Sequence, residues 1–291
     1  MSWIAFILLS AVLASASTLA EKKTLLREHA LPFAATLAFV AALFSLPFIF
    51  FADWAHFTPR IVTAMYLASI ASAAGFLLLT KALRHMEVSV ASSLLIFSPA
   101  IASILAFIVL GEALTRFQSA GIVFMIIGSY VLEARKGESM LEPFRTLWSS
   151  KYVHFILWAL LLYAGTSLLD RFLLNGVGIQ PVAYLGVMHL FLAVNFGVAM
   201  AWAGGGFPGI AAGFRSGGFW TFIVAFLTIG YRMADTFAIQ TAPAVGLVLA
   251  LKRLSTLITT IVGGEIFHEH HILRKSIACA IMLAGGFLLI R

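Results

Sequence analysis

Ten long apolar stretches constrain this chain more than any other feature. Each has close to the ~20 apolar residues that a helix needs to cross the ~30 Å hydrocarbon core of a bilayer. The connections between them are short, and none is long enough for a soluble domain. The stretches run approximately over residues 2–20, 31–51, 61–80, 88–110, 117–133, 152–170, 181–203, 218–238, 243–262 and 272–290. The sequence therefore predicts an all-α integral membrane protein with ten transmembrane helices.

Composition supports this fold class. Of the 291 residues, 62% are hydrophobic and only 11% are charged, whereas soluble domains are about half apolar and about a quarter charged. The net charge of +7 does not indicate nucleic acid as a partner, because the Lys and Arg residues form short clusters between apolar runs, as topology signals do. The single Cys279 excludes an intrachain disulfide.

The first stretch is interpreted as a membrane span, although Ala14-Ser15-Ala16 resembles a signal-peptide cleavage site. A signal peptide needs basic residues before its apolar region, and none is present here. Two connections are candidate linkers. The segment 133–151 is rich in charged residues, and the other candidate is the Gly-rich segment 204–218. The glycines within residues 201–210 are interpreted as a flexible loop, and those before Phe287 as helix-packing residues.

The two halves of the chain match each other. Residues 91–128 align without gaps with residues 248–285 at an offset of 157, which pairs Ser98 with Ser255, Glu112 with Glu269 and Gly128 with Gly285. Near the start of each half the offset is 149, which pairs Glu21-Lys22 with Asp170-Arg171 and Pro32 with Pro181. Such matches indicate a duplication. We predict a first five-helix repeat over residues 1–135, a connecting loop over 136–151 and a second repeat over 152–291.

Five is an odd number of spans, so the second repeat enters the membrane from the opposite side. The predicted fold is therefore two inverted five-helix repeats related by a pseudo-two-fold axis in the membrane plane. Transporters of this architecture bind their substrate near the bilayer midplane, between the repeats, and work by alternating access.

With ten spans, two five-helix halves and an acidic residue after the fourth and ninth spans, the chain resembles the drug/metabolite transporter superfamily, of the EamA-like kind. The acidic positions are Gly111-Glu112 and His268-Glu269. The second departs from the usual Gly-Glu, although Gly264-Glu265 lies just upstream. The resemblance implies a secondary transporter of small metabolites without a cofactor, whose central cavity is lined by both halves. It does not imply a particular substrate.

Lys252 and Arg253 stand side by side in the middle of the ninth predicted span. About ten residues at 1.5 Å each separate them from either interface, a distance their stems cannot bridge. A charge facing lipid costs at least ~2.5–3.5 kcal/mol on insertion scales, so the pair should face a wet cavity or the protein interior. Two interpretations remain open: they bind an anionic group of the substrate, or they pair with buried carboxylates such as Asp170 and Asp235. The pair also resembles the basic pair that holds the substrate phosphate in the ninth helix of sugar-phosphate translocators.

Other intramembrane polar residues are weaker candidates. Arg232 and Asp235 lie three residues apart on one helix face and can satisfy each other, but either way they mark the interior of the bundle. Asp170-Arg171 and Glu21-Lys22 lie at span ends, where exposure to interfacial water is the expectation, and Asp170 is the candidate for coupling to protons. The aromatic and His candidates for lining a cavity are Trp158, Tyr163, Tyr184, His189 and Tyr231. Tyr and Trp are also common interface anchors.

No metal site is expected. The run His268-Glu269-His270-His271 lacks the H-E-x-x-H spacing because Ile272 follows. We interpret it as a solvated turn. No nucleophile or phosphate-loop motif occurs either.

The sequence therefore favours a secondary active transporter that moves a small anionic or amphoteric metabolite across the cell membrane, coupled to protons or to an exchanged counter-substrate. The alternatives are an intramembrane enzyme acting on a lipid or a peptide, for which no catalytic constellation is visible, and a scaffold or receptor. The positive-inside rule places both termini outside, whereas the resemblance favours the cytoplasm, so the orientation stays open.

Overall fold

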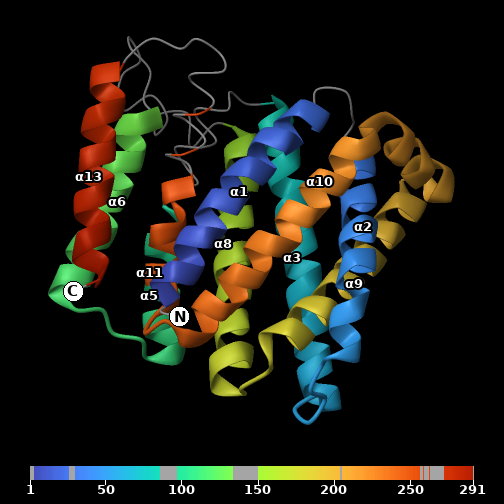
Figure 1. Ribbon diagram of the computed structural model, residues 1–291, viewed down its shortest axis with the longest axis horizontal. Helices are drawn as coiled ribbons and strands as arrows, with labels where there is room; N and C mark the ends of the chain where they lie inside the picture. The colour runs from blue at the N-terminus through green and yellow to red at the C-terminus, as the bar shows by residue number, and fades with distance from the viewer. Residues whose placement is uncertain are drawn as a thin grey trace. The chain divides into compact units, whose positions relative to one another are not determined.

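A computed structural model describes residues 3–25, 30–85, 97–133, 150–203, 205–255, 258, 262 and 272–290. Within these ranges the chain is helical and contains no strand. The helices are α1 (Trp3–Leu25), α2 (Ala30–Phe50), α3 (Pro59–His85), α5 (Ser98–Leu110), α6 (Arg116–Glu133), α8 (Lys151–Arg171), the π-helix η2 (Phe172–Gly176), α9 (Pro181–Trp202), α10 (Gly206–Thr241), α11 (Val245–Lys252) and α13 (Ile272–Ile290), as Figure 1 shows.

Six of these helices are long and apolar enough to cross a membrane. The candidate spans are Trp3–Glu21, Leu31–Phe50, Pro59–Leu79, Lys151–Gly176, Pro181–Trp202 and Gly217–Thr241. Shorter apolar helices cover Ser98–Leu110, Arg116–Gly128 and Ala280–Leu289. The protein is therefore a multi-pass, all-helical membrane protein. The described part of the predicted ninth span is α11 and the few residues after it, and its later residues lie largely outside the described ranges.

The chain divides into two compact units, and each combines segments from both halves of the sequence. Unit 1 contains Met1–Leu77 and Leu169–Thr241, and unit 2 contains Leu78–Leu168 and Ala242–Arg291. Helices α3 and α8 each contribute residues to both units. The predicted repeats over 1–135 and 152–291 therefore do not coincide with the compact units.

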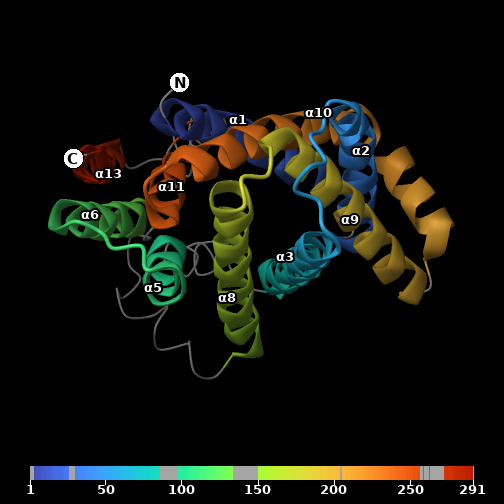
Figure 2. The same ribbon diagram turned by 90° about the horizontal axis from the view of Figure 1, so that it is seen from below.

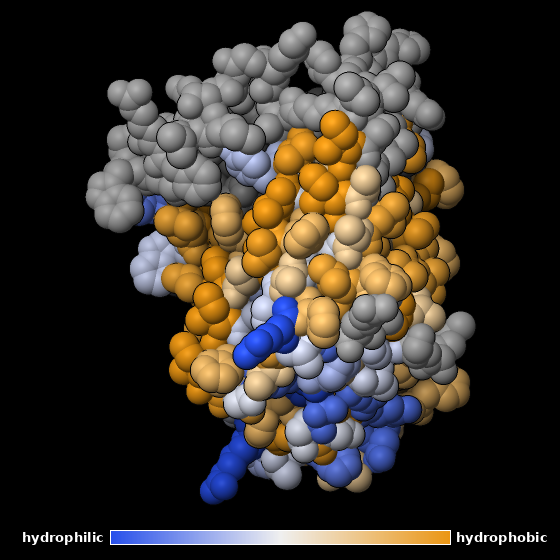
Figure 3. All heavy atoms as spheres, turned by 90° about the vertical axis from the view of Figure 1, so that its left-hand side faces the viewer, coloured by the Kyte–Doolittle hydropathy of each residue, from blue (hydrophilic) through white to orange (hydrophobic). Residues whose placement is uncertain are grey.

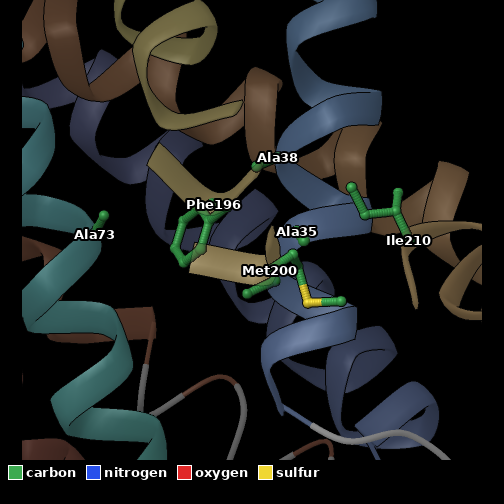
Figure 4. Packing of buried hydrophobic residues seen from close by; sticks show 7 residues of the cluster. Ala35, Ala38, Ala73, Phe196, Met200 and Ile210 are labelled. Atoms are coloured by element: carbon green, nitrogen blue, oxygen red, sulfur yellow. The ribbon is translucent and has the colours of Figure 1, made fainter. Parts of the chain in front are cut away.

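In unit 1, α1 packs along α10, and α2 packs against both α9 and α10 (Figure 2). Small residues of α2 let these helices approach closely. Ala35 and Ala38 pack with Phe196 and Met200 of α9 and with Ile210 of α10, as the close-up in Figure 4 shows. In lipid, helix association depends on such close packing, because apolar side chains gain little by leaving an apolar solvent.

The Gly-rich segment 204–218 is helical over most of its length, so the expectation of a flexible loop was wrong. Helix α10 begins at Gly206, and a kink at Gly218, with φ 51° and ψ −141°, separates this first part from the rest. Close packing against α2 explains one of the glycines, Gly213. A Cβ at Gly213 would lie 2.3 Å from the Thr36 hydroxyl oxygen. Gly213 therefore serves the contact with α2, whereas a Cβ at Gly205 or Gly209 would meet Met200 of α9.

In unit 2, α6 packs along α13, and α5 packs against α11. The α6–α13 contact brings backbone against backbone. A Cβ at Gly121 would lie 2.9 Å from the carbonyl oxygen of Gly285, and a Cβ at Gly285 would lie 2.9 Å from that of Gly121. A Cβ at Gly128 would lie 2.9 Å from the backbone nitrogen of Met282. The interpretation of the glycines before Phe287 as helix-packing residues is confirmed at Gly285.

The face of the molecule in Figure 3 is largely hydrophobic. Several large apolar side chains of α6 and α13 are exposed, among them Phe117, Val123, Leu283 and Phe287. A soluble protein rarely exposes a contiguous apolar surface of this kind. The exposed surface is what a helix bundle presents to lipid.

Candidate functional site

Unit 1 contains a cluster of ionisable and hydroxyl side chains inside its membrane-spanning helices. We call it the unit 1 polar cluster. It draws one residue from α1, one from the end of α8, one from α9 and three from α10. Its members are Ser10, Asp170, Tyr184, Tyr231, Arg232 and Asp235. None is exposed in the described structure. Ionisable groups at such depth need partners from the protein.

Asp170 is held by Tyr184, whose hydroxyl donates a hydrogen bond to Oδ1 of the carboxyl group. Arg232 acts on both groups through its charge, and its guanidinium hydrogen-bonds the side chain of Tyr231. The charge of Asp235 also influences Asp170. The Oδ1 atom of Asp235 accepts a hydrogen bond of 2.5 Å from Ser10 Oγ. The cluster thus combines one cation and two carboxyl groups, with the cation acting on Asp170 and with hydroxyls as hydrogen-bond donors.

His189 of α9 is joined to α2 through Ser45. Ser45 Oγ donates to the carbonyl oxygen of Ala41 at 2.7 Å and lies 2.6 Å from His189 Nδ1. A hydroxyl has one proton to donate, so Nδ1 carries the proton of the imidazole and donates it to Ser45. This leaves Nε2 as the acceptor. His189 is 2% exposed, and Nε2 has no hydrogen-bond partner in the described part of the chain.

The end of α8 is not exposed to water, contrary to the expectation for Asp170-Arg171. Arg171 is buried and donates from Nη1 to the carbonyl oxygen of Ile239 at 2.5 Å. Directly after it the chain forms the π-helix η2, a rare geometry that is common at functional sites. The carbonyl oxygen of Leu174, in η2, accepts a hydrogen bond of 3.1 Å from Gln240 Nε2. These bonds tie the α8–η2 junction to the end of α10, which positions Asp170.

The basic pair lies in unit 2, at the end of α11. Lys252 occupies the last turn of this helix and Arg253 follows it, and both are half-buried. Arg253 Nη2 donates to the hydroxyl oxygen of Ser98, the first residue of α5. At the opposite end of α11, the backbone N–H of Val245 donates to Glu112 Oε2 at 3.0 Å. A carboxylate at the N-terminus and a cation at the C-terminus both match the helix dipole.

The remaining aromatic candidates lie in the part of α8 that belongs to unit 2. Tyr163 is half-buried, whereas Trp158 is 61% exposed. The candidates are therefore divided between the units. Asp170, His189, Tyr231, Arg232 and Asp235 are in unit 1, and Trp158, Tyr163, Lys252 and Arg253 are in unit 2.

Four partners were not predicted as site residues. Ser10 and Ser45 carry no signal beyond being polar residues within apolar spans, whereas Ser98 and Glu112 stood out in the repeat alignment as paired positions. Among the described residues, no group of three or more His, Cys, Asp and Glu side chains is placed to hold a metal ion. The run His268–His271 lies outside the described residues.

Comparison with known proteins bears on the first half of the chain and on the fold. Residues 1–133 match the model of the EamA-like transporter family, which confirms the resemblance to the drug/metabolite transporter superfamily. No curated protein matches the chain. A solved crystal structure resembles it with a TM-score of 0.73 and 16% sequence identity, covering 98% of this chain and 95% of the other. At that identity the likeness shows a shared fold alone.

Proposed function

From the premise that residues 1–133 of this multi-pass membrane transporter match the EamA-like family, we propose that the protein is a secondary active transporter of the cell membrane. It moves a small anionic or amphoteric metabolite by alternating access between two inverted five-helix repeats. The observation that carries the substrate class is the half-buried basic pair at the end of α11, inside an apolar stretch.

The α6–α13 contact supports the inverted repeats. The alignment at an offset of 157 makes Gly128 equivalent to Gly285 and Met125 equivalent to Met282. A Cβ at Gly128 would lie 2.9 Å from the Met282 nitrogen, and a Cβ at Gly285 would lie 2.9 Å from the Met125 nitrogen. The contact of Gly128 with Met282 and the contact of Gly285 with Met125 thus involve equivalent residues of the two helices with their roles exchanged. A two-fold axis between two equivalent helices produces such reciprocal contacts.

The packing partners of the other helices fit the same symmetry. Helix α2 packs against α9, α5 against α11, and α6 against α13. In the predicted duplication these are the second and seventh, fourth and ninth, and fifth and tenth spans. Each of these three pairs joins one helix to its equivalent in the other half, which a pseudo-two-fold axis allows, whereas the contacts of α10 with α1 and α2 join helices that are not equivalent. Inverted repeats of this kind support alternating access.

The environment of Lys252 and Arg253 supports anion binding. The preceding residues Val248 and Leu251 are buried, so the two charges follow an apolar helix face at membrane depth. Arg253 donates to the hydroxyl of Ser98, which orients the guanidinium. An anionic substrate group gains charge-assisted hydrogen bonds from such a cation, each contributing ~1.5–3 kcal/mol.

The unit 1 polar cluster supplies the candidate for coupling. Asp170 accepts a hydrogen bond from Tyr184 and is influenced by Arg232 and Asp235. A carboxyl group with an adjacent cation can change partners when it gains or loses a proton. We assign proton coupling to Asp170. His189 Nε2 and Tyr231 are assigned to substrate contacts in the same unit, and Tyr163 and Trp158 to contacts in unit 2.

The test is uptake of a panel of anionic, amphoteric and cationic metabolites by proteoliposomes that contain the full chain. Removal of the Arg253 charge in Arg253→Ala should lower uptake of the anionic substrate about tenfold or more, since 1.4 kcal/mol corresponds to tenfold. Arg253→Lys, which keeps a positive charge, should retain more uptake of the anionic substrate than Arg253→Ala. Arg116→Ala, which removes an exposed cation at the start of α6, is the matched control and should leave uptake unchanged. Native uptake in both Lys252→Ala and Arg253→Ala would contradict the binding role.

A further inference from the structure

Glu21 is a membrane carboxyl group outside the unit 1 polar cluster. It lies at the end of the candidate span Trp3–Glu21 and is half-buried rather than exposed. Its Oε1 accepts a hydrogen bond of 3.1 Å from Ser17 Oγ, one turn earlier in α1. Ser17 Oγ lies 3.3 Å from Thr228 Oγ1 of α10. Because Ser17 donates its single proton to Glu21, Thr228 donates to Ser17. The three groups form one hydrogen-bond chain that ends on the carboxyl.

The other described side chains that pack beside this end of α1 are apolar. Ser17 and Thr228 are themselves buried, and Ala20, next to Glu21, packs in a cluster with Phe33 of α2 and Val224 of α10. Helix α2 contains no ionisable residue between Leu31 and Phe50. An ionised carboxylate in such a place loses its hydration and gains one hydroxyl in return, which is unfavourable. Uptake of a proton removes the charge and keeps the hydrogen bond.

Tyr231, Arg232 and Asp235, the ionisable groups in the later part of α10, lie away from Glu21 along the α1–α10 contact. Asp235 meets Ser10, and Thr228 meets Ser17, so the two helices are antiparallel and the charged part of α10 faces the start of α1. Arg232 and Tyr231 belong to that part, and Arg215 lies near the other end of α10, before the kink at Gly218. Lys22 and Lys23 follow Glu21 in the sequence.

Glu21 is also the sequence counterpart of Asp170. The offset of 149 aligns the two residues, and both carboxyl groups accept a hydrogen bond from a hydroxyl, Ser17 for Glu21 and Tyr184 for Asp170. They differ in their neighbours. Asp170 shares its surroundings with Arg232 and Asp235, whereas the described residues that contact or flank Glu21 across α1 and α10 are hydroxyls and apolar side chains. The two halves thus carry equivalent carboxyl groups in unlike electrostatic environments.

We propose that Glu21 is a second proton-binding site of the transporter, at which the carboxylate takes up one proton from water on one side of the membrane and releases it to the other during each cycle. This inference rests on the proposed transport function and adds a coupling residue to it. Proton uptake converts the carboxylate to the neutral acid, and no other reactant is consumed. Thr228 and Ser17 position the carboxyl group.

Infrared difference spectroscopy of the full chain in vesicles tests the site without any substrate. As the pH is lowered, the wild type should show the carbonyl stretch of a protonated carboxyl group in an apolar environment, and this band should be absent from Glu21→Gln. Ser17→Ala should shift the band, because the hydrogen bond is lost. Asp53→Asn removes an exposed carboxyl group and should leave the band in place. The amide bands of the same spectra report folding.

A Glu21→Gln spectrum identical to that of the wild type would overturn the proposal. If Glu21→Gln fails to fold, Glu21→Asp replaces it and should keep the band at a shifted position. Transport measurements then distinguish failure of the proton site at Glu21 from failure of the proposed transport function. For a metabolite found in the uptake panel, Glu21→Gln should retain exchange but lose at least tenfold of the uptake driven by a pH gradient, and full gradient-driven uptake would also overturn the proposal. Absence of wild-type uptake would instead count against the transport function, and the infrared result would still decide the proton site.

Discussion

Unit 1 and unit 2 differ in where polar side chains and glycines join their membrane helices. In unit 1 the helices are joined by polar side chains, such as Ser10 with Asp235 and Ser45 with His189. In unit 2, α6 and α13 meet where glycines bring the backbones together, at Gly121 and Gly285. The charges of unit 2 occupy the two ends of α11 instead.

This difference separates two tasks within one chain. A glycine contact is a matter of shape and does not respond to protons or ions. A network of carboxyl groups, a guanidinium and hydroxyls does respond, because each change in protonation changes which bonds the network can make. We therefore assign coupling to unit 1, and scaffolding together with substrate charge recognition to unit 2. Three substitutions test that division, beginning with the one expected to have the largest effect.

Arg232→Gln should destabilise the protein most. It leaves the carboxyl group of Asp170 without the cation that acts on it, and breaking one partner of a buried charged pair costs about 3–5 kcal/mol. The midpoint of thermal unfolding in detergent measures the loss. In the double variant Arg232→Gln/Asp170→Asn the loss should be smaller, since one uncompensated carboxylate is removed. Equal losses in the single and double variants would mean that the two residues are not energetically coupled.

Gly128→Val should cause the second-largest loss of stability. Its side chain would overlap the backbone nitrogen of Met282, 2.9 Å from the Cβ position, and overpacking of this kind costs about 1–3 kcal/mol. The same thermal measurement applies. Gly165→Ala in α8 is the matched control, because nothing lies within 4 Å of its Cβ position. An alanine in place of a helical glycine stabilises by about 0.5–1 kcal/mol, so the control should not lower the midpoint. An unchanged midpoint in Gly128→Val would show that unit 2 does not depend on close backbone contact.

Glu112→Ala should have the smallest effect, confined to the start of α11. The backbone N–H of Val245 loses its acceptor, and loss of a cap at a helix N-terminus costs about 0.5–2 kcal/mol. Hydrogen exchange at Val245 should become faster, while exchange in α9 of unit 1 should stay as in the wild type. Glu112→Gln keeps an acceptor and loses only the charge, so its effect should be about 0.3–1 kcal/mol. If exchange rose equally in both units, the cap would not be a local feature of unit 2.

Hydropathy was a good guide to where the helices lie. Predicted spans such as 31–51 and 181–203 correspond to α2 (Ala30–Phe50) and α9 (Pro181–Trp202), because a long apolar run has few alternatives in a bilayer. The same reasoning failed at residues 204–218. Glycine there signalled a loop, yet Gly213 lies against Thr36 of α2 within a helix. Local composition cannot distinguish a glycine that bends the chain from one that admits a neighbouring helix.

The site was less predictable than the spans. Arg232 and Asp235 were recognised as interior residues from their depth in an apolar run, but Asp170 and Glu21 were expected to meet interfacial water because they end their spans. The structure instead gives Asp170 a hydrogen bond from Tyr184 and Glu21 one from Ser17. Lys252 and Arg253 could be identified as unusual, while the contact of Arg253 with Ser98 depends on how α5 and α11 pack.

By itself the sequence determined that the chain is a helical membrane protein, where its apolar segments fall, and that its halves match at offsets of 157 and 149. These properties follow from the transfer of each segment into lipid, which depends on local composition. Only the tertiary structure decided which polar groups inside the membrane are neighbours. Asp170 and Arg232 lie far apart along the chain, and only the packing of α8, α9 and α10 brings their charges together.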